Sequence, residues 1–209
     1  MESLLGIDEA GRAPLAGPVA VGFVLVPLGF DVVREFPGVK DSKKLSKERR
    51  EEIYRALVER KRKGDVRFCV RFSDHLSIDE LGMTRAVRRA IVSGARYLAP
   101  EPDEALLMLD GALYAPSHYA QRTVIHGDDL VPLISLASIA AKVERDRLMK
   151  RLSKKYPQYG FEKHKGYGTR AHWKAIQLHG LCAIHRRTYC KLLLDGANTS
   201  FDLRAETVV

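Results

Sequence analysis

Several short apolar stretches of this sequence lead directly into acidic side chains. The pairs are residues 4–7 with Asp8 and Glu9, residues 105–109 with Asp110, and residues 123–125 with Asp128. A carboxylate at the end of a buried strand is costly to desolvate unless a positive charge compensates it. We therefore expect a fold in which strand ends meet and share a cationic partner.

The apolar patterns predict strands that alternate with helices. Strands are expected at residues 4–7, 19–26, 66–72, 105–109 and 123–125; helices are expected at 46–63, from a capping box at Ser77 to Pro100, at 133–155, and from Thr169 to Gly180. The alternating pattern of residues 66–72 favours a strand at the edge or on one face of a mixed sheet. The continuous run 105–109 favours a central strand covered on both faces. The order of elements predicts an α/β layer structure with a mixed sheet.

Length and composition indicate one globular domain, residues 1–209. No apolar run approaches the roughly 18 residues of a membrane span, and no signal-peptide pattern is present, so we expect a cytoplasmic protein without membrane contact. The three cysteines are far apart, which disfavours disulfides or a zinc site. Residues 141–195 hold 14 Lys and Arg but four Asp and Glu. This basic segment favours a nucleic-acid partner over a solvated basic surface without one.

Converging carboxylates at strand ends indicate a metal site. Mutual repulsion would raise at least one pKa unless cations bind, and hard oxygen ligands suit Mg²⁺ or Mn²⁺. Two such ions could activate water for a phosphodiester displacement. The same residues are also ordinary turn chemistry. Adjacent strand residues face opposite ways, so Asp8 is the stronger candidate, and Glu9 joins it only if the strand bends or supplies a backbone oxygen.

A set of motifs, in order over nearly the whole chain, resembles the bacterial ribonuclease HII family. They are Gly6-Ile-Asp-Glu-Ala-Gly-Arg, Pro14-Leu-Ala-Gly-Pro-Val, Asp41-Ser-Lys-Lys-Leu, Ile78-Asp-Glu-Leu-Gly, Leu109-Asp-Gly, Gly127-Asp, the run from Ile134 to Asp146, His164-Lys-Gly-Tyr-Gly-Thr and Ile184-His-Arg-Arg. Together these motifs are specific, although each alone is weak. The resemblance implies a ribonuclease H-like mixed sheet flanked by helices, with residues 156–195 as a C-terminal substrate-binding helical segment and 196–209 as a tail.

The resemblance also implies an activity and its residues. It implies a two-metal endonuclease that cuts the RNA strand of RNA/DNA hybrids and incises at single ribonucleotides in duplex DNA, with roles in ribonucleotide removal and RNA primer removal. Asp8, Glu9, Asp110 and Asp128 match the acidic catalytic and metal-binding residues. Gly11, Arg12, Ala13, Lys43, Lys44, Lys165 and Tyr167 are the expected substrate-binding residues. Within this set, Gly11 and Arg12 match the loop that reads the 2′-hydroxyl, and Tyr167 matches the tyrosine at the RNA-to-DNA junction.

Ala13 departs from the family pattern, which has a second glycine there. A Cβ disfavours positive φ and occupies space beside the backbone, so we expect Ala13 to weaken the preference for a lone ribonucleotide. Lys43 and Lys44 are equally compatible with a phosphate contact and with the turn before a helix.

Two other classes remain open on the residues alone: a nucleic-acid-binding module with structural carboxylates, and a metal-dependent DNA nuclease or recombinase. The family further implies a monomer, with a sliding clamp as a candidate partner.

Overall fold

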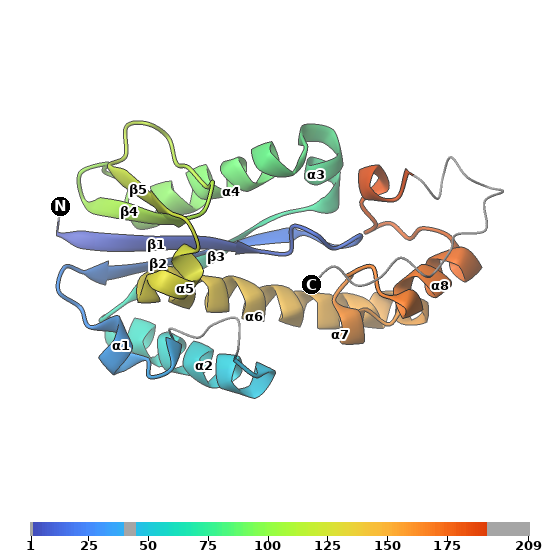
Figure 1. Ribbon diagram of the computed structural model, residues 1–209, viewed down its shortest axis with the longest axis horizontal. Coiled ribbons are helices and arrows are strands. Elements are labelled where there is room, and N and C mark those ends of the chain that lie inside the picture. Colours follow the sequence, from blue (N-terminus) through green and yellow to red (C-terminus); the bar gives the residue numbers. More distant parts are fainter. Residues whose placement is uncertain (1, 40–44, 192–209) are drawn as a thin grey trace.

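A mixed five-stranded sheet lies at the centre of the computed structural model, which describes residues 2–39 and 45–191 (Figure 1). The strands are β1 (Ser3–Ala10), β2 (Val19–Pro27), β3 (Arg67–Ser73), β4 (Ala105–Asp110) and β5 (Gln121–Val124), in the spatial order β3-β2-β1-β4-β5. The β1–β2 and β2–β3 pairs are antiparallel, and the β1–β4 and β4–β5 pairs are parallel. The predicted mixed α/β sheet is confirmed, with β3 at one edge.

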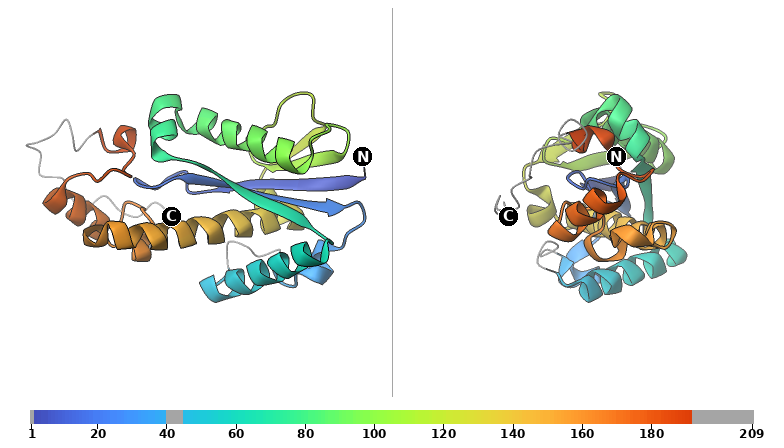
Figure 2. Two further views of the ribbon diagram at one scale, coloured as in Figure 1. Left: turned by 180° about the vertical axis from the view of Figure 1, so that it is seen from behind. Right: turned by 90° about the vertical axis from the view of Figure 1, so that its right-hand side faces the viewer.

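Helices cover both faces of this sheet (Figure 2). The described helical elements are α1 (Val32–Glu35), α2 (Lys47–Lys63), α3 (His75–Leu81), α4 (Met83–Leu98), α5 (Gly127–Leu130), α6 (Pro132–Lys155), α7 (Phe161–His164) and α8 (Arg170–His179), with short 3-10 turns at Pro157–Tyr159 and Arg187–Tyr189. Helix α4 packs on one face through a core that includes Phe23 and Ile91. Helix α6 packs on the other face, with α2 outside it, through a second core that includes Leu57 and Leu136. The sheet is therefore the middle of a layered structure.

Two glycines let α6 approach the sheet closely. A Cβ built on Gly22 in β2 would lie 2.1 Å from the backbone oxygen of Ala137, and one on Gly6 in β1 would lie 2.5 Å from that of Leu133. Any larger residue would push the helix away, because these neighbours are backbone atoms. Glycine in these two strands therefore sets how closely α6 packs on β1 and β2.

The predicted helices largely agree with the structure. The side chain of Ser46 accepts a hydrogen bond from the Arg49 amide at the start of α2, and Thr169 caps α8 in the same way through the His172 amide. Helix α6 begins at Pro132 and ends at Lys155, close to the predicted bounds. These ends were predictable because the capping signals are local.

The prediction of one helix starting at Ser77 is wrong. The N-cap is Asp74, whose side chain accepts from the Ser77 amide, and Gly82 then separates α3 from α4. Asp79 of the supposed capping box instead accepts hydrogen bonds from the amides of Arg187 and Thr188 at 2.8 and 3.0 Å. This carboxylate is used for a long-range contact rather than for a helix start.

Two strands also differ in detail from the sequence prediction. Strand β1 does not stop at Ile7 but continues through Asp8 and Glu9 to Ala10, paired with β2. Residues of β4 alternate between buried and half-buried, so this strand is not covered completely on both faces. The reason is that α6 packs mainly across β1 and β2 rather than across β4.

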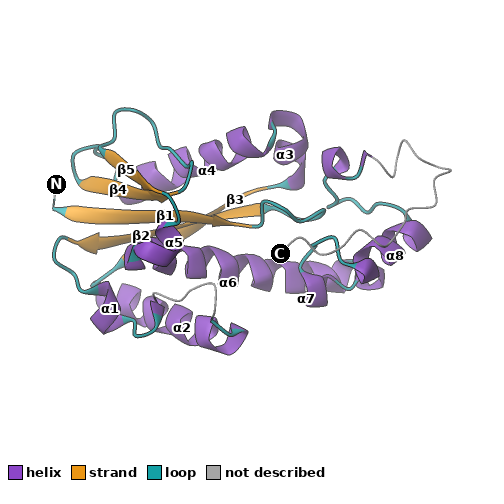
Figure 3. Cartoon of the chain, viewed as in Figure 1, coloured by secondary structure: helices purple, strands orange, loops and turns teal. Residues whose placement is uncertain are grey.

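The C-terminal elements α7 and α8 lie beyond the end of the sheet, beside the last turns of α6 (Figure 3). They have a small core of their own, which includes Tyr159, Phe161 and Ile176 and also takes in Leu15 from the loop after β1. Among residues 2–39 and 45–191, no helix has the length and apolar character of a membrane span.

Candidate active site

Strand register brings the predicted carboxylates together. Ile7 of β1 pairs with Leu109 of β4 in parallel, so the next residue on each strand, Asp8 and Asp110, lies at the same level of the sheet. Asp128 is contributed by α5, which directly follows β5, and its amide donates to Asp110 Oδ1 at 3.2 Å. These side chains and Glu9 line one open cavity of about 470 Å³.

Asp8 and Glu9 both reach this cavity although they are neighbours on one strand. The Glu9 amide donates to Asp8 Oδ1 at 2.7 Å. The Glu9 carboxylate is bridged to the Arg12 guanidinium at 3.1 Å. Strict alternation along a strand would place Asp8 and Glu9 on opposite faces, but here both residues line the same cavity.

The site has an excess of buried negative charge. Burial raises the pKa of Asp8 well above its usual range, and the neighbouring Glu9 and Asp110 carboxylates raise it further against a hydrogen bond from Ser138. Burial also raises the pKa of Glu9, while Arg12 lowers it. Glu9 Oε2 is buried without a hydrogen-bond partner. An arrangement of this kind is stabilised by added positive charge.

The donor set fits divalent metal ions. Four carboxylates, one with a buried unpaired oxygen, are the hard ligands that Mg²⁺ and Mn²⁺ prefer. Over the described part of the chain, no three acidic, histidine or cysteine groups yet surround a single point at ligand distance. Asp8, Glu9, Asp110 and Asp128 are the side chains that would hold such an ion.

The loop after β1 forms a second wall of the cavity. Gly11 has φ +94°, and a Cβ there would lie 2.0 Å from Arg145 Nε, so glycine is required on both counts. Arg12 and Ala13 are exposed at the rim. Ala13 is not among the described non-glycine residues with positive φ, which are His126 and Lys165. Its Cβ thus adds bulk at the rim without straining the backbone.

Two fully buried arginines hold this loop from below. Arg186 donates to the carbonyls of Gly11, Arg12 and Gly17 at 2.7, 2.6 and 2.9 Å, and Arg145 donates to those of Ala16, Pro18 and Lys165 at 3.3, 2.9 and 3.1 Å. Burial, with the nearby charge of Arg145, lowers the pKa of Arg186 to about 10, so it stays charged at neutral pH. The loop is therefore rigid at its backbone and rests on positive charge.

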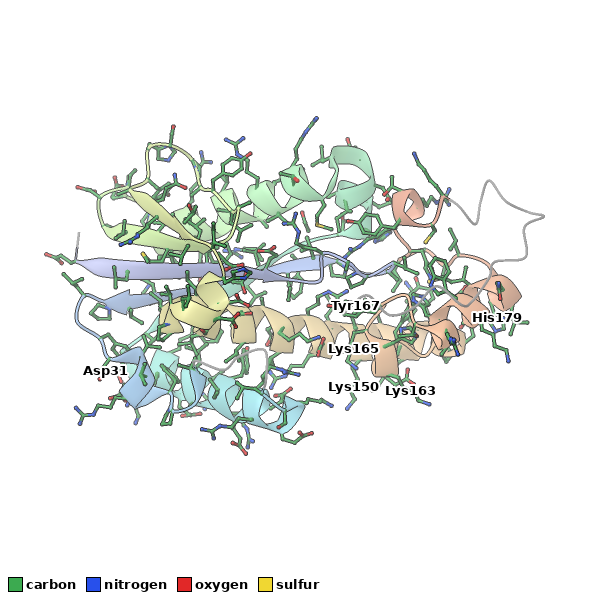
Figure 4. The ribbon with its side chains drawn as sticks, in the orientation of Figure 1. Asp31, Lys150, Lys163, Lys165, Tyr167 and His179 are labelled. Atoms are coloured by element: carbon green, nitrogen blue, oxygen red, sulfur yellow. The ribbon has the colours of Figure 1, made fainter. Side chains whose placement is uncertain are left out.

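Tyr167 closes the cavity from the C-terminal side. It lies with Lys165 on the loop between α7 and α8 (Figure 4). Tyr167 is 38% exposed and lines the cavity, with Lys142 Nζ 5.7 Å from its ring centroid. Lys165 is not among the residues that line the cavity, and its Nζ donates to the carbonyl oxygen of Glu162. Lys43 and Lys44 lie outside the described residues.

Three further polar residues line the cavity and were not singled out from the sequence: Arg50, Ser138 and Lys142. Ser138 and Lys142 are four residues apart, so the predicted helix at 133–155 already placed them on one face. No pattern in the sequence places Arg50 near these residues. It lies in α2, and only the packing of α2 outside α6 brings it to the cavity.

The comparisons with known proteins agree on one family. The family model described as Ribonuclease HII matches residues 5–192. The chain belongs to the ribonuclease HII family. A ribonuclease HII of Geobacter metallireducens is 41% identical over 192 residues, which is 90% of this chain and 83% of that protein. One of Bacillus cytotoxicus is 40% identical over 189 residues, which is 90% of this chain and 69% of that protein.

Solved structures of ribonuclease HII and its relatives have the same fold. The ribonuclease H2 of Pyrococcus horikoshii OT3 superposes with a TM-score of 0.72 at 26% identity, covering 89% of this chain and 93% of that one. The Archaeoglobus fulgidus RNase HII, solved in a complex with PCNA, gives 0.71 at 26% identity over 98% and 97% of the two chains. Bst-RNase HIII, solved with Mn²⁺, shares the fold at a TM-score of 0.61 and 21% identity, over 85% of this chain and 63% of that one.

Membership in the ribonuclease HII family establishes the class of activity. The enzyme is a ribonuclease H, an endonuclease that acts on RNA/DNA hybrids, and its partner is therefore nucleic acid. Ribonuclease H enzymes depend on divalent metal ions, which agrees with the carboxylate set of this cavity.

Proposed function

We propose that the enzyme incises on the 5′ side of single ribonucleotides embedded in duplex DNA, in addition to cutting the RNA strand of hybrids. The observation that carries this proposal is the position of Arg12 and Tyr167, which line the same cavity as the carboxylates. A backbone-rich loop can bond the 2′-hydroxyl, the group that distinguishes RNA from DNA. An aromatic ring can stack on the adjacent sugar or base.

Asp8, Glu9, Asp110 and Asp128 are the residues that would hold two Mg²⁺ or Mn²⁺ ions. When bound, such ions activate a water and stabilise the leaving oxygen. The water oxygen bonds to phosphorus, the bond from phosphorus to O3′ breaks, and O3′ takes a proton. The products are a 5′-phosphate and a 3′-hydroxyl.

The protein's own residues position the substrate in this scheme. Arg12 and Lys142 place cationic groups at the rim of the cavity, where phosphates of the cut strand would lie. Ser138 orients the Asp8 carboxyl through its hydrogen bond. The carbonyl groups of Gly11 and Arg12 accept hydrogen bonds from Arg186, so in this proposal the amides of the two residues, rather than their carbonyls, bond the 2′-hydroxyl.

Ala13 modifies this proposal. Its Cβ lines the cavity beside Arg12, where the family pattern has glycine, and it is accommodated without positive φ. We expect Ala13 to weaken the preference for a lone ribonucleotide more than it weakens hydrolysis of long hybrids. The variant Ala13→Gly should raise the rate on the single-ribonucleotide duplex relative to the rate on the long hybrid. An unchanged ratio of these two rates would refute the role of Ala13.

The biological setting that we propose is ribonucleotide removal from DNA and RNA primer removal, by a monomeric cytoplasmic enzyme. Residues 1–209 act as one catalytic unit in this proposal, with 156–195 as the substrate-binding segment. The Archaeoglobus protein was solved with PCNA, which supports a sliding clamp as a candidate partner. Residues 196–209, the proposed tail, lie outside the described residues.

The decisive experiment offers the protein three labelled duplexes with Mg²⁺ or Mn²⁺: all DNA, DNA with one ribonucleotide, and a long RNA/DNA hybrid. We expect cutting of the last two only. Asp8→Asn and Asp110→Asn should each abolish turnover while duplex binding is retained. Near-normal rates in either variant would refute the metal-site assignment. Cutting of the all-DNA duplex would favour a DNA nuclease, and binding without cutting would favour a binding module.

A further inference from the structure

Three histidines cluster behind the loop that carries Tyr167, away from the carboxylates. His172 in α8 and His185 after it are 0% and 2% exposed, and the ring of His164 stacks on that of His172 at 4.4 Å between centroids. Tyr159 and Phe161 pack against these rings. None of the three histidines lines the catalytic cavity, so the chemistry proposed above does not use them.

The hydrogen bonds of the cluster fix where each ring carries its proton. His185 Nδ1 lies 2.9 Å from the amide nitrogen of Cys182 and 3.3 Å from the carbonyl oxygen of the same residue, and the closer contact, with the amide as donor, makes this nitrogen an unprotonated acceptor. The neutral ring then has its proton on Nε2, which lies 3.0 Å from His172 Nε2. His185 is therefore the donor in this contact and His172 the acceptor. It follows that His172 has its proton on Nδ1.

The last hydrogen bond of this series is made with the backbone of Tyr167. His172 Nδ1 lies 2.9 Å from the carbonyl oxygen of Tyr167 and donates to it. The same oxygen accepts from the amide of Thr169 at 2.8 Å, and the Tyr167 amide donates to the carbonyl of His164 at 2.9 Å. Both backbone groups of Tyr167 are thus held, while its ring remains at the cavity.

His164 is fixed in the same way and supports the neighbouring backbone. The Gly166 amide donates to its Nδ1 at 3.2 Å, and its Nε2 donates to the carbonyl of Tyr159 at 2.7 Å. The loop between α7 and α8 is therefore tied to neutral imidazoles on both sides of Tyr167. A second proton on any of these rings would sit on its accepting nitrogen, where it would meet the N–H group that now donates to that nitrogen. Burial lowers the pKa values of His172 and His185 to about 4, so both are neutral when the enzyme works near pH 7.

We propose that His185 and His172 form a directional hydrogen-bond relay that positions Tyr167 against the ribonucleotide and so sets the preference for single ribonucleotides over long hybrids. The two histidines are positioning residues, since neither contacts the substrate. The part of this inference that concerns substrate preference rests on the proposed function of Tyr167. The relay itself rests only on the contacts of the cluster.

The first test is nitrogen-15 NMR of the histidine rings of the full-length protein at pH 7. We expect the neutral ring of His185 to carry its proton on Nε2 and the neutral ring of His172 to carry its proton on Nδ1. The opposite tautomer in either ring, or an imidazolium, would overturn the relay. This measurement needs no substrate, so it decides the relay even if the wild-type protein fails to cut the single-ribonucleotide duplex, an outcome that would refute the proposed function separately.

The second test measures kcat/KM for variants on two substrates. The quantity compared is kcat/KM on the single-ribonucleotide duplex divided by kcat/KM on the long RNA/DNA hybrid. His172→Phe removes both the acceptor and the donor, and we expect this ratio to fall about tenfold or more, as for other small misplacements of a substrate-positioning group. His172→Gln keeps an acceptor and a donor and should retain more of the preference. His179→Gln is the matched control, because His179 is an exposed residue at the end of the same helix (Figure 4).

A double-mutant cycle separates positioning from general destabilisation. In a Tyr167→Ala background, His172→Gln should change the ratio no further, because the side chain that the relay positions is already absent. An equal change in both backgrounds would overturn the proposal, as would a ratio unchanged from wild type in His172→Phe. If His172→Phe does not fold, the His172→Gln cycle and the NMR measurement still decide the question.

Discussion

Replacing Gly22 by alanine tests whether the close packing of α6 on the sheet sets the geometry of the active site. The new Cβ would lie 2.1 Å from the Ala137 backbone oxygen, and 3.0 Å is about the closest approach that real Cβ atoms make. Helix α6 must therefore move by about 1 Å. The next residue on the helix is Ser138, which bonds the Asp8 carboxyl, and Lys142 follows one turn later.

The expected magnitude has two parts. Overpacking of this kind destabilises a protein by about 1–3 kcal/mol, which corresponds to a fall in Tm of roughly 2–12 °C for a chain of this size. A shift of about 1 Å in a positioning group lowers the rate by up to about 100-fold. We therefore expect Gly22→Ala to lose far more activity than its folded fraction explains, measured as hybrid cleavage at 25 °C alongside a thermal melt.

Leu57→Ala is the matched control for this prediction. Leu57 is fully buried in α2, on the outer side of α6, and its truncation should destabilise the fold by about 2–5 kcal/mol without moving α6 on the sheet. Its rate per folded molecule should stay near wild type. Equal loss of activity in both variants would refute the reasoning, as would a near-normal rate in Gly22→Ala.

Three further predictions follow from charges described above. Burial lowers the pKa values of His172 and His185 to about 4, so below pH 6.5 the unfolded chain binds more protons than the folded protein. The free energy of unfolding should therefore rise as the pH is raised through this range. Urea unfolding should show that His172→Gln removes roughly 2 kcal/mol of the difference in this free energy between pH 5 and pH 7. Because burial and neighbouring carboxylates raise the pKa of Asp8, metal-free Asp8→Asn should melt at a higher temperature than wild type near pH 8 and gain less from added Mn²⁺; a lower melting temperature would contradict the electrostatic account. If Lys142 contacts one phosphate, Lys142→Ala should reduce the slope of log affinity against log salt by about 1, whereas an unchanged slope would remove that contact.

Much of the fold was predictable because its signals are local. The caps of α2 and α8 and the parallel strands that end near Asp8 and Asp110 follow from residues adjacent in sequence. From these strands alone, the meeting of two carboxylates could be inferred. The division of α3 from α4 follows from two local features, the side-chain cap at Asp74 and the positive φ of Gly82, which outweigh the capping-box pattern at Ser77. The placement of Asp128 on the short helix α5 depends on tertiary packing instead.

The supports of the site could not be predicted from sequence in the same way. Arg145 and Arg186 read as part of a basic surface, yet both are fully buried and bond carbonyls of the loop after β1. No periodicity reveals such a contact, because its partners are backbone atoms far away in the chain. The tautomers of His172 and His185 likewise follow only from which groups surround each ring.

The hydrogen bonds from Arg186 to the loop after β1 have a consequence for folding during translation. The hydrogen bond from Arg186 to the Gly11 carbonyl spans 175 positions of the chain. A ribosome adding about 5–20 residues per second takes roughly 10 to 35 seconds between these two residues. All four carboxylates have been synthesised well before Arg186, but the loop beside them lacks its anchor until Arg186 itself has been added. The substrate-facing wall of this active site is thus completed only after all of its carboxylates are already in the chain.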